Sequence, residues 1–203
     1  MRHRILFSFF ILAVLVPCAM PQTASSTRQA AFKSKEESPK WTAADERSLL
    51  AKARLGDAGA QMWLGAAYEQ GWFGKSNFPE ALKWFRKSAE QGDPDAENSL
   101  GQMYEDGEGV IQSYSLAAKW YRRAAEHDVD LGGAGQGRNN LGMLYLGGYG
   151  VPKDYVQAYM WFRLADFESN PNLSIAKAHL SPEQILEAEQ LVEAWKSRHI
   201  TPQ

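Results

Sequence analysis

Leu64-Gly65-Ala66-Ala67-Tyr68 is the stretch that decides the fold, because the chain repeats it twice more. It returns as Leu100-Gly101-Gln102-Met103-Tyr104 and as Leu141-Gly142-Met143-Leu144-Tyr145, 36 and then 41 positions later. Other landmarks keep the same two offsets, namely Trp84, Trp120 and Trp161, and Ala81, Ala117 and Ala158. Several residue types that recur in phase, at a period between about 20 and 50 residues, are typical of a stack of repeats.

Each repeat has the pattern of two helices joined by a glycine-rich turn. Ala60, Leu64 and Tyr68 fall at i, i+4 and i+8, which gives the first helix one apolar stripe. Gly65 lies inside that helix at a cost of about 1 kcal/mol, so we expect its missing side chain to let a neighbouring helix come close. The second helix is predicted to begin at residues that can cap it, seven positions before each tryptophan: Asn77, Ser113 and Asp154.

The order of these landmarks resembles the Sel-1-like repeats, which are relatives of the tetratricopeptide repeats. That family's motif runs Ala, Leu-Gly, Tyr, Gly-x-Gly-Val, Asp, Ala, Trp-Tyr/Phe and Ala-Ala, and residues 96–125 and 141–165 follow it best. The first copy departs from it, because Phe73-Gly74 stands where Gly109-Val110 and Gly150-Val151 stand later. The resemblance implies an all-α fold, an α-solenoid of stacked antiparallel helix pairs with about three Sel-1-like repeats and N- and C-terminal capping helices.

The N-terminus has the composition of a targeting segment. Basic Arg2 and Arg4 precede an apolar run at 5–16, which predicts a secretory signal peptide over residues 1–26. An uncleaved membrane anchor is one alternative, although a span needs about 20 apolar residues. A lipoprotein modified at Cys18 is another, although Pro17 stands where that pattern has a small residue. We expect a periplasmic or secreted protein that meets the membrane only through its signal peptide.

The remaining chain divides into a tether and one repeat domain. Residues 27–40 are polar and charged, which predicts a disordered linker, and the α-solenoid is expected over 41–199. Five extra residues before the third repeat fall within 128–137, where four glycines predict a loop. The other predicted parts are an N-terminal capping helix that begins at Thr42, repeats at about 57–91, 92–127 and 135–166, and a C-terminal capping helix over 182–198 that follows Ser181.

Composition and motifs argue against several functions. With 22 Lys and Arg against 24 Asp and Glu, the net charge of −2 gives no electrostatic footprint for nucleic acid. None of the four histidines has a metal-ligand spacing, and Cys18 lies in the predicted signal peptide, so we expect no metal and no cofactor. The sequence has no Gly-x-Ser-x-Gly elbow, and its Gly-x-Gly pieces lie between helices rather than after a strand. We therefore predict no catalytic residues and a non-enzymatic protein.

A surface for a partner is then the expected functional part. The likeness to tetratricopeptide arrays implies that first-helix residues beside the Leu-Gly pair line a concave face, which would bind another protein or peptide. The candidate residues are Met62, Glu69, Asn98, Gln102, Glu105, Asn139 and Met143, with Ala66 and Leu146 completing the three sets. Asn98 and Asn139 are equivalent, and each amide could bond a peptide backbone or simply be solvated. The hypothesis predicts that Asn98→Ala with Asn139→Ala weakens partner binding without lowering the melting temperature.

Two other functions remain open from the sequence. Some secreted members of the family with cysteine pairs in nearly every repeat are linked to β-lactam hydrolysis, although the chain after residue 26 has no cysteine. A module that binds cell-wall glycan is the second alternative, with Trp72 and Tyr149 of the inter-helix turns as its aromatic surface.

Overall fold

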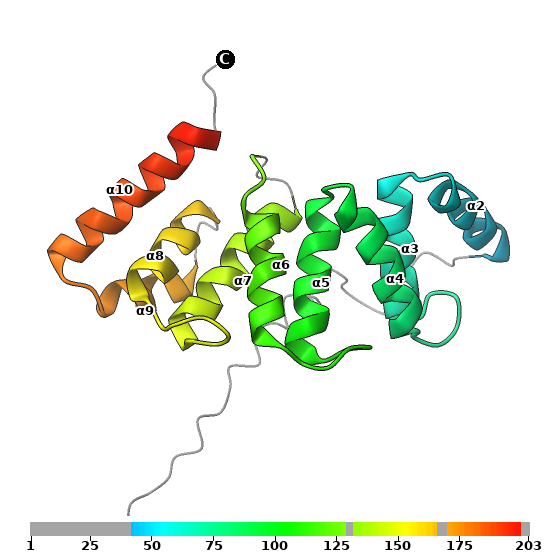
Figure 1. Cartoon of the computed structure of the whole chain (residues 1–203), viewed down its shortest axis with the longest axis horizontal. Helices are drawn as coiled ribbons and strands as arrows, with labels where there is room; N and C mark the ends of the chain where they lie inside the picture. The colour runs from blue at the N-terminus through cyan, green and yellow to red at the C-terminus, as the bar shows by residue number, and fades with distance from the viewer. Residues whose placement is uncertain (1–41, 129–131, 166–169, 200–203) are drawn as a thin grey trace, which may run out of the picture. The chain divides into compact units, whose positions relative to one another are not determined.

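The computed structural model describes residues 42–128, 132–165 and 170–199, so the predicted signal peptide and linker lie outside the described part. The chain separates at residues 38 and 39 into two units, and every helix described here belongs to the second. These helices are α2 (Ala43–Arg54), α3 (Ala58–Gln70), α4 (Phe78–Glu90), α5 (Pro94–Asp106), α6 (Tyr114–Ala125), α7 (Gly133–Gly147), α8 (Tyr155–Leu164), α9 (Pro171–Ala178) and α10 (Pro182–His199) (Figure 1). None of the helices in the described ranges is long and apolar enough to cross a membrane.

The helices pack in the order of the chain. Helices α3 and α4, α5 and α6, and α7 and α8 form three pairs, and α4–α5 and α6–α7 contacts join one pair to the next. The first helices α5 and α7 also touch directly, α2 packs on α3, and both α9 and α10 pack on α8. The prediction of an all-α stack of helix pairs is confirmed.

The glycine of each Leu-Gly pair marks the closest approach within a helix pair. A Cβ added at Gly65 would lie 2.6 Å from the ring of Phe85, and one at Gly101 would overlap the ring of Tyr121. The third copy repeats the contact, because a Cβ at Gly142 would lie 2.6 Å from the Phe162 ring. The expected role of the glycine is confirmed, since any larger side chain would push the second helix away.

The predicted caps form at the start of each second helix. The side chains of Asn77, Ser113 and Asp154 each accept a hydrogen bond from a backbone N–H of the first turn. Thr42 caps α2 in the same way, and Asp45 bonds back to the Thr42 N–H at 2.8 Å, which completes a capping box. These bonds satisfy amides that a helix leaves free at its N-terminus.

The segment before the third pair differs from the expected loop over 128–137. Helix α7 already begins at Gly133, which lies directly against the backbone of Pro94. A Cβ at Gly137 would lie 2.7 Å from the methyl group of Ala124. The glycines at these two positions therefore let α7 approach α5 and α6, instead of making the segment flexible. Residues 129–131 of the predicted loop lie outside the described part.

Candidate partner-binding surfaces

Most of the residues predicted to bind a partner lie between successive first helices. Glu69, Asn98 and Gln102 are at most 9% exposed. Met62 packs against the apolar cluster that includes α5, and Met143 packs against the one that includes α8 and α9. These side chains help to join one repeat to the next, and a role for them in partner binding stays a prediction.

Asn98 is the clearest case, because its amide bonds twice to the following repeat. Its Nδ2 donates to Gln136 Oε1 at 3.1 Å, and its Oδ1 accepts from Asn140 Nδ2 at 3.0 Å. The side chain is 3% exposed. Because the side chain is buried, a partner could reach this amide only by separating the two repeats, and removing Asn98 should weaken the stack itself.

Asn139 makes a similar link one repeat further on. Its Oδ1 accepts from Asn170 Nδ2 at 2.9 Å, and Asn170 also caps α9 by accepting from the Asn172 N–H at 3.0 Å. The two equivalent asparagines thus both reach towards the next first helix. The two asparagines occupy the same position in the repeat because each bonds the segment that packs after its own helix pair.

The predicted glutamates are engaged within the chain as well. Glu105 accepts a hydrogen bond from the Tyr121 hydroxyl at 2.5 Å, across the α5–α6 pair. Glu69 is 8% exposed, and its Oε2 accepts from Gln70 Nε2 at 3.1 Å. The Glu105 carboxylate therefore joins α5 to α6, and the Glu69 carboxylate bonds the next residue of its own helix.

A second set of equivalent polar residues was missed by the sequence reasoning. Gln61, Glu97 and Arg138 each lie three residues before the leucine of the Leu-Gly pair, and they are 4%, 1% and 1% exposed. The signal that could have found them is the same pair of offsets, 36 and 41, at a position that is polar in all three copies. A buried polar residue at the same position of every repeat indicates that it forms hydrogen bonds inside the protein in each copy.

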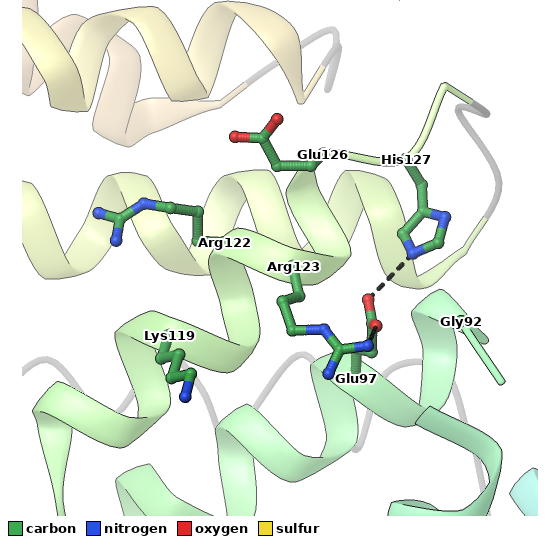
Figure 2. Close-up of a pocket in the computed structure, with 7 residues that line it drawn as sticks. All are labelled: Gly92, Glu97, Lys119, Arg122, Arg123, Glu126 and His127. Atoms are coloured by element: carbon green, nitrogen blue, oxygen red, sulfur yellow. Dashed lines mark hydrogen bonds and ion pairs between the residues drawn. The ribbon is translucent and has the colours of Figure 1, made fainter. Parts of the chain in front are cut away.

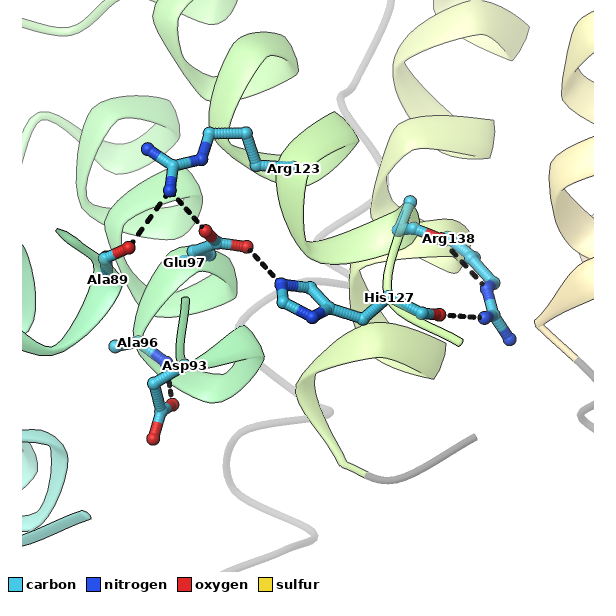
Figure 3. Close-up of polar contacts among 8 residues, drawn as sticks. Ala89, Asp93, Ala96, Glu97, Arg123, His127 and Arg138 are labelled. Carbon is cyan, nitrogen blue, oxygen red and sulfur yellow. Dashed lines mark hydrogen bonds and ion pairs between the residues drawn. The ribbon is translucent and has the colours of Figure 1, made fainter. Parts of the chain in front are cut away.

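Glu97 is the carboxylate at the centre of this set. Its Oε1 lies 2.7 Å from Arg123 Nη2, and its Oε2 lies 3.0 Å from His127 Nε2 (Figure 3). Arg123 also donates to the carbonyl oxygen of Ala89 at 3.0 Å. The buried charge is therefore paired within its own helix pair, by the C-terminal end of α6 and the residue that follows it, and Arg123 links this cluster to the end of α4.

Arg138 is a fully buried guanidinium that donates to three backbone carbonyl oxygens. It donates to the carbonyls of Ala125, His127 and Leu164, at 3.2, 2.7 and 3.1 Å. Its Cζ also lies 4.5 Å from the centroid of Trp195 in α10. Carbonyls at the ends of α6 and α8 are left without helical partners, so Arg138 satisfies groups that burial would otherwise make costly.

A hollow of about 470 Å³ opens beside Glu97 on the side of the second helices. Its wall contains Gly92, Glu97, Lys119, Arg122, Arg123, Glu126 and His127 (Figure 2). Arg122 Nη2 donates to the Tyr145 hydroxyl at 2.7 Å, and Glu126 lies 3.4 Å from His199 Nε2. Because the cations outnumber the acids on this wall, the hollow favours an anionic group.

Helix α10 shows how an acidic helix packs on a second helix of this stack. Glu189 accepts from the Tyr159 hydroxyl at 2.7 Å and from Arg163 Nε at 3.0 Å. Partial burial would raise the pKa of Glu189, but the hydrogen bonds from Arg163 and Tyr159 and the arginine charge outweigh it and hold the pKa below its usual value. The contact with α8 therefore favours the charged form of Glu189.

The aromatic residues of the turns form pairs instead of one surface. Trp72 lies with its ring centroid 6.2 Å from that of Trp63, whose side chain is 45% exposed. Tyr149 pairs with Tyr114 at 5.4 Å. Within the described ranges no three His, Cys, Asp or Glu side chains gather as a metal site.

The fold and these junctions define a class, that of α-helical repeat proteins whose stacked pairs are joined by buried polar residues. The Sel1 repeat model matches residues 58–93, 94–129 and 136–165, about half of the sequence. The chain belongs to the Sel1 repeat family.

Two solved structures are similar to this chain. One is c5321, a protective antigen present in uropathogenic Escherichia coli strains that displays an SLR fold, with 32% identity and a TM-score of 0.69 over 82% of this chain. The match covers 36% of that antigen, so this chain spans about a third of its length. The other is a Sel1 repeat protein from Oxalobacter formigenes, with 32% identity, a TM-score of 0.53, and coverage of 74% of this chain and 98% of that one. No curated protein matches the chain.

Proposed function

We propose that the chain is a non-enzymatic scaffold of the bacterial envelope that binds another protein. The observation that carries this proposal is the separation of charge between the two kinds of helix. The second helices α4, α6 and α8 contain seven Lys and Arg against two Glu, whereas the first helices α3, α5 and α7 contain five acidic residues and one Arg. A chain of net charge −2 thus keeps its cations together on one set of helices, which favours a charged partner.

The buried polar bonds support a scaffold in a second way. They fix each repeat against the next, since Asn98 bonds α7, Arg138 bonds the end of α6, and Arg123, which Glu97 holds, bonds the end of α4. The surface side chains are therefore held on a rigid support. A preorganised surface loses little conformational entropy when it binds, and affinity rises accordingly. The same rigidity is what an adaptor needs to present a partner in one orientation.

Export is the remaining part of the proposal. The basic and then apolar N-terminus supports a periplasmic or secreted location, and the similar Escherichia coli protein is a protective antigen. Partner proteins would then be those of the same compartment.

Cross-linking in cells tests the proposal. The full chain, carrying a C-terminal affinity tag, would be cross-linked in its native host, purified under denaturing conditions and analysed by mass spectrometry. The expected result is one or a few envelope proteins enriched over a tagged exported protein of similar size. Recovery of the same proteins with both baits, or of none, contradicts a scaffold.

Binding of cell-wall glycan is a second candidate, favoured by the partly exposed Trp63–Trp72 pair. Aromatic rings of this kind can stack on sugar faces. The purified chain would be sedimented with purified peptidoglycan, and Trp63→Ala should abolish sedimentation if the pair binds glycan. Tyr149→Ala serves as the matched control, because it removes a turn aromatic from a different repeat.

A further inference from the structure

We propose that the basic surface of the second helices binds an acidic amphipathic helix of a partner protein. This basic surface is defined by six exposed side chains: Lys83, Arg86 and Lys87 of α4, and Lys119, Arg122 and Arg123 of α6. The inference rests on the proposed function, since it names the surface and the kind of partner that the scaffold takes. Opposite charge is the complementarity that steers and orients such a complex.

The chain contains its own example of such a helix. Helix α10 has four glutamates and packs on α8, where Glu189 bonds Arg163 and Tyr159. Arg86 and Arg122 are the equivalents of Arg163 at the repeat offsets of 36 and 41. On α4 and α6 this arginine donates to a tyrosine hydroxyl of the next first helix, that of Tyr104 at 2.8 Å and that of Tyr145 at 2.7 Å. No described helix covers α4 and α6 with glutamates as α10 covers α8.

The residue one helical turn before that arginine shows why α4 and α6 suit a charged partner. On α8 it is Met160, which α10 helps to bury to 6% exposure. On α4 and α6 the equivalent residues are Lys83 and Lys119, and both are exposed. The covered helix thus has an apolar side chain where the uncovered helices have a cation, so binding there should rely on ion pairs more than α10 does.

The cations of the basic surface are held in place before any partner arrives. Lys87 Nζ lies 4.7 Å from the centroid of the Trp84 ring, and Arg123 Cζ lies 4.9 Å from that of Trp120. Cation–π contacts of this kind restrict the long side chains and reduce the entropy lost on binding. Leu116 of α6, 41% exposed and one turn before Lys119, offers an apolar contact to the other face of the bound helix.

A peptide copied from α10 is the probe for this surface. Residues 182–195 contain four Glu and no Lys or Arg, so a fluorescein-labelled peptide of this sequence is an acidic amphipathic segment. Fluorescence anisotropy would measure its binding to the purified full chain at low and high salt. We expect binding that weakens by about tenfold or more in Lys83→Glu with Lys119→Glu, because two attractions are lost and two repulsions are gained, and each of these four changes is worth about twofold. High salt should weaken it as well, since exposed charges are screened beyond a few ångströms.

The matched control is Lys52→Glu with Lys177→Glu, which changes the net charge equally on exposed lysines of α2 and α9. It should bind the peptide within about twofold of the unchanged chain, and thermal unfolding should show both variants folded. Equal loss in the control shows a general charge effect and overturns the proposal. If the peptide binds the Lys83→Glu with Lys119→Glu variant as tightly as the unchanged chain, the peptide replaces α10 on α8 instead of binding the basic surface. This result also overturns the proposal.

Two further outcomes separate this inference from the proposed function and from a membrane. If cross-linking in cells recovers the same partner with Lys83→Glu and Lys119→Glu, the surface is wrong while the scaffold function stands. If the unchanged chain recovers no partner but binds the peptide, the function is wrong while the surface stands. Binding to vesicles with 30% anionic lipid that depends on these lysines, without peptide binding, would assign the surface to a membrane and overturn the proposal.

Discussion

Replacing Glu97 with glutamine tests whether the buried carboxylate holds α5 to α6 and, through Arg123, to the end of α4. The side chain is 1% exposed, and it meets Arg123 at 2.7 Å and His127 at 3.0 Å. Removing one partner of a fully buried ion pair costs about 3–5 kcal/mol. Here the side chains of Arg123 and His127 are 43% and 31% exposed, so water can still solvate them, and we expect a loss of about 2 kcal/mol in the free energy of unfolding. For a domain of this size that corresponds to a melting temperature lower by about 4–8 °C.

Thermal unfolding followed by circular dichroism at 222 nm measures this loss. Glu80→Gln is the matched control, because Glu80 pairs with Lys83 at 3.0 Å but their side chains are 37% and 52% exposed. An exposed pair contributes about 0–1 kcal/mol, so the control should change the melting temperature by at most about 4 °C. Equal shifts in the two variants would refute the assignment of Glu97 as a residue that holds α5 to α6.

Three further substitutions test the packing, the amide bonds and the C-terminal contact. Gly101→Ala should destabilise the chain by about 1–3 kcal/mol in urea unfolding, because its methyl would overlap a tyrosine ring, whereas Gly59→Ala, with no contact nearer than 3.6 Å, should stabilise it slightly. Asn98→Ala should lower the free energy of unfolding by about 1–2 kcal/mol, and an unchanged melting temperature would contradict the two bonds seen here. Glu189 has a lowered pKa, so its stabilisation is present above the ordinary value of 4.5 and is lost as the pH falls through the lower folded value. The melting-temperature difference between the unchanged chain and Glu189→Gln should therefore begin to shrink below about pH 4.5 and keep shrinking as the pH falls; a difference that stays constant from about pH 6 to the lowest pH at which both proteins fold would exclude the carboxylate as its cause.

The fold could be predicted because its determinants are local and repeated. Gly65 and its equivalents are read as close contacts because glycine inside a helix needs a reason, and the second-helix caps are read from side-chain chemistry at a fixed distance from a tryptophan. The start of α7 was not predictable in the same way. Four glycines in ten residues have the composition of a loop, and only the nearby backbone of Pro94 shows that Gly133 belongs to a helix.

The candidate binding residues depended on which way each first helix faces, and sequence periodicity does not define that direction. Asn98 and Asn139 share a position in the repeat, which fits a binding face and a packing face equally well. The partners Gln136, Asn140 and Asn170 decide between the two, because they come from the following repeat. The expectation that Asn98→Ala with Asn139→Ala leaves the melting temperature unchanged therefore disagrees with these bonds.

The apolar landmarks and the buried polar residues have different tasks in this stack. Leucine, glycine and tryptophan recur in every repeat, so the core they form would accept one helix pair as readily as another. Gln61, Glu97 and Arg138 differ from copy to copy, and each finds its own partners: the Ala53 carbonyl and Gln91, a guanidinium with an imidazole, and three carbonyls. A helix pair in the wrong place would bury Gln61 or Arg138 without its partners from the preceding helices, at a cost of several kcal/mol for the charged Arg138. The identical residues thus make the pairs stack, and the differing residues favour the order in which they do so.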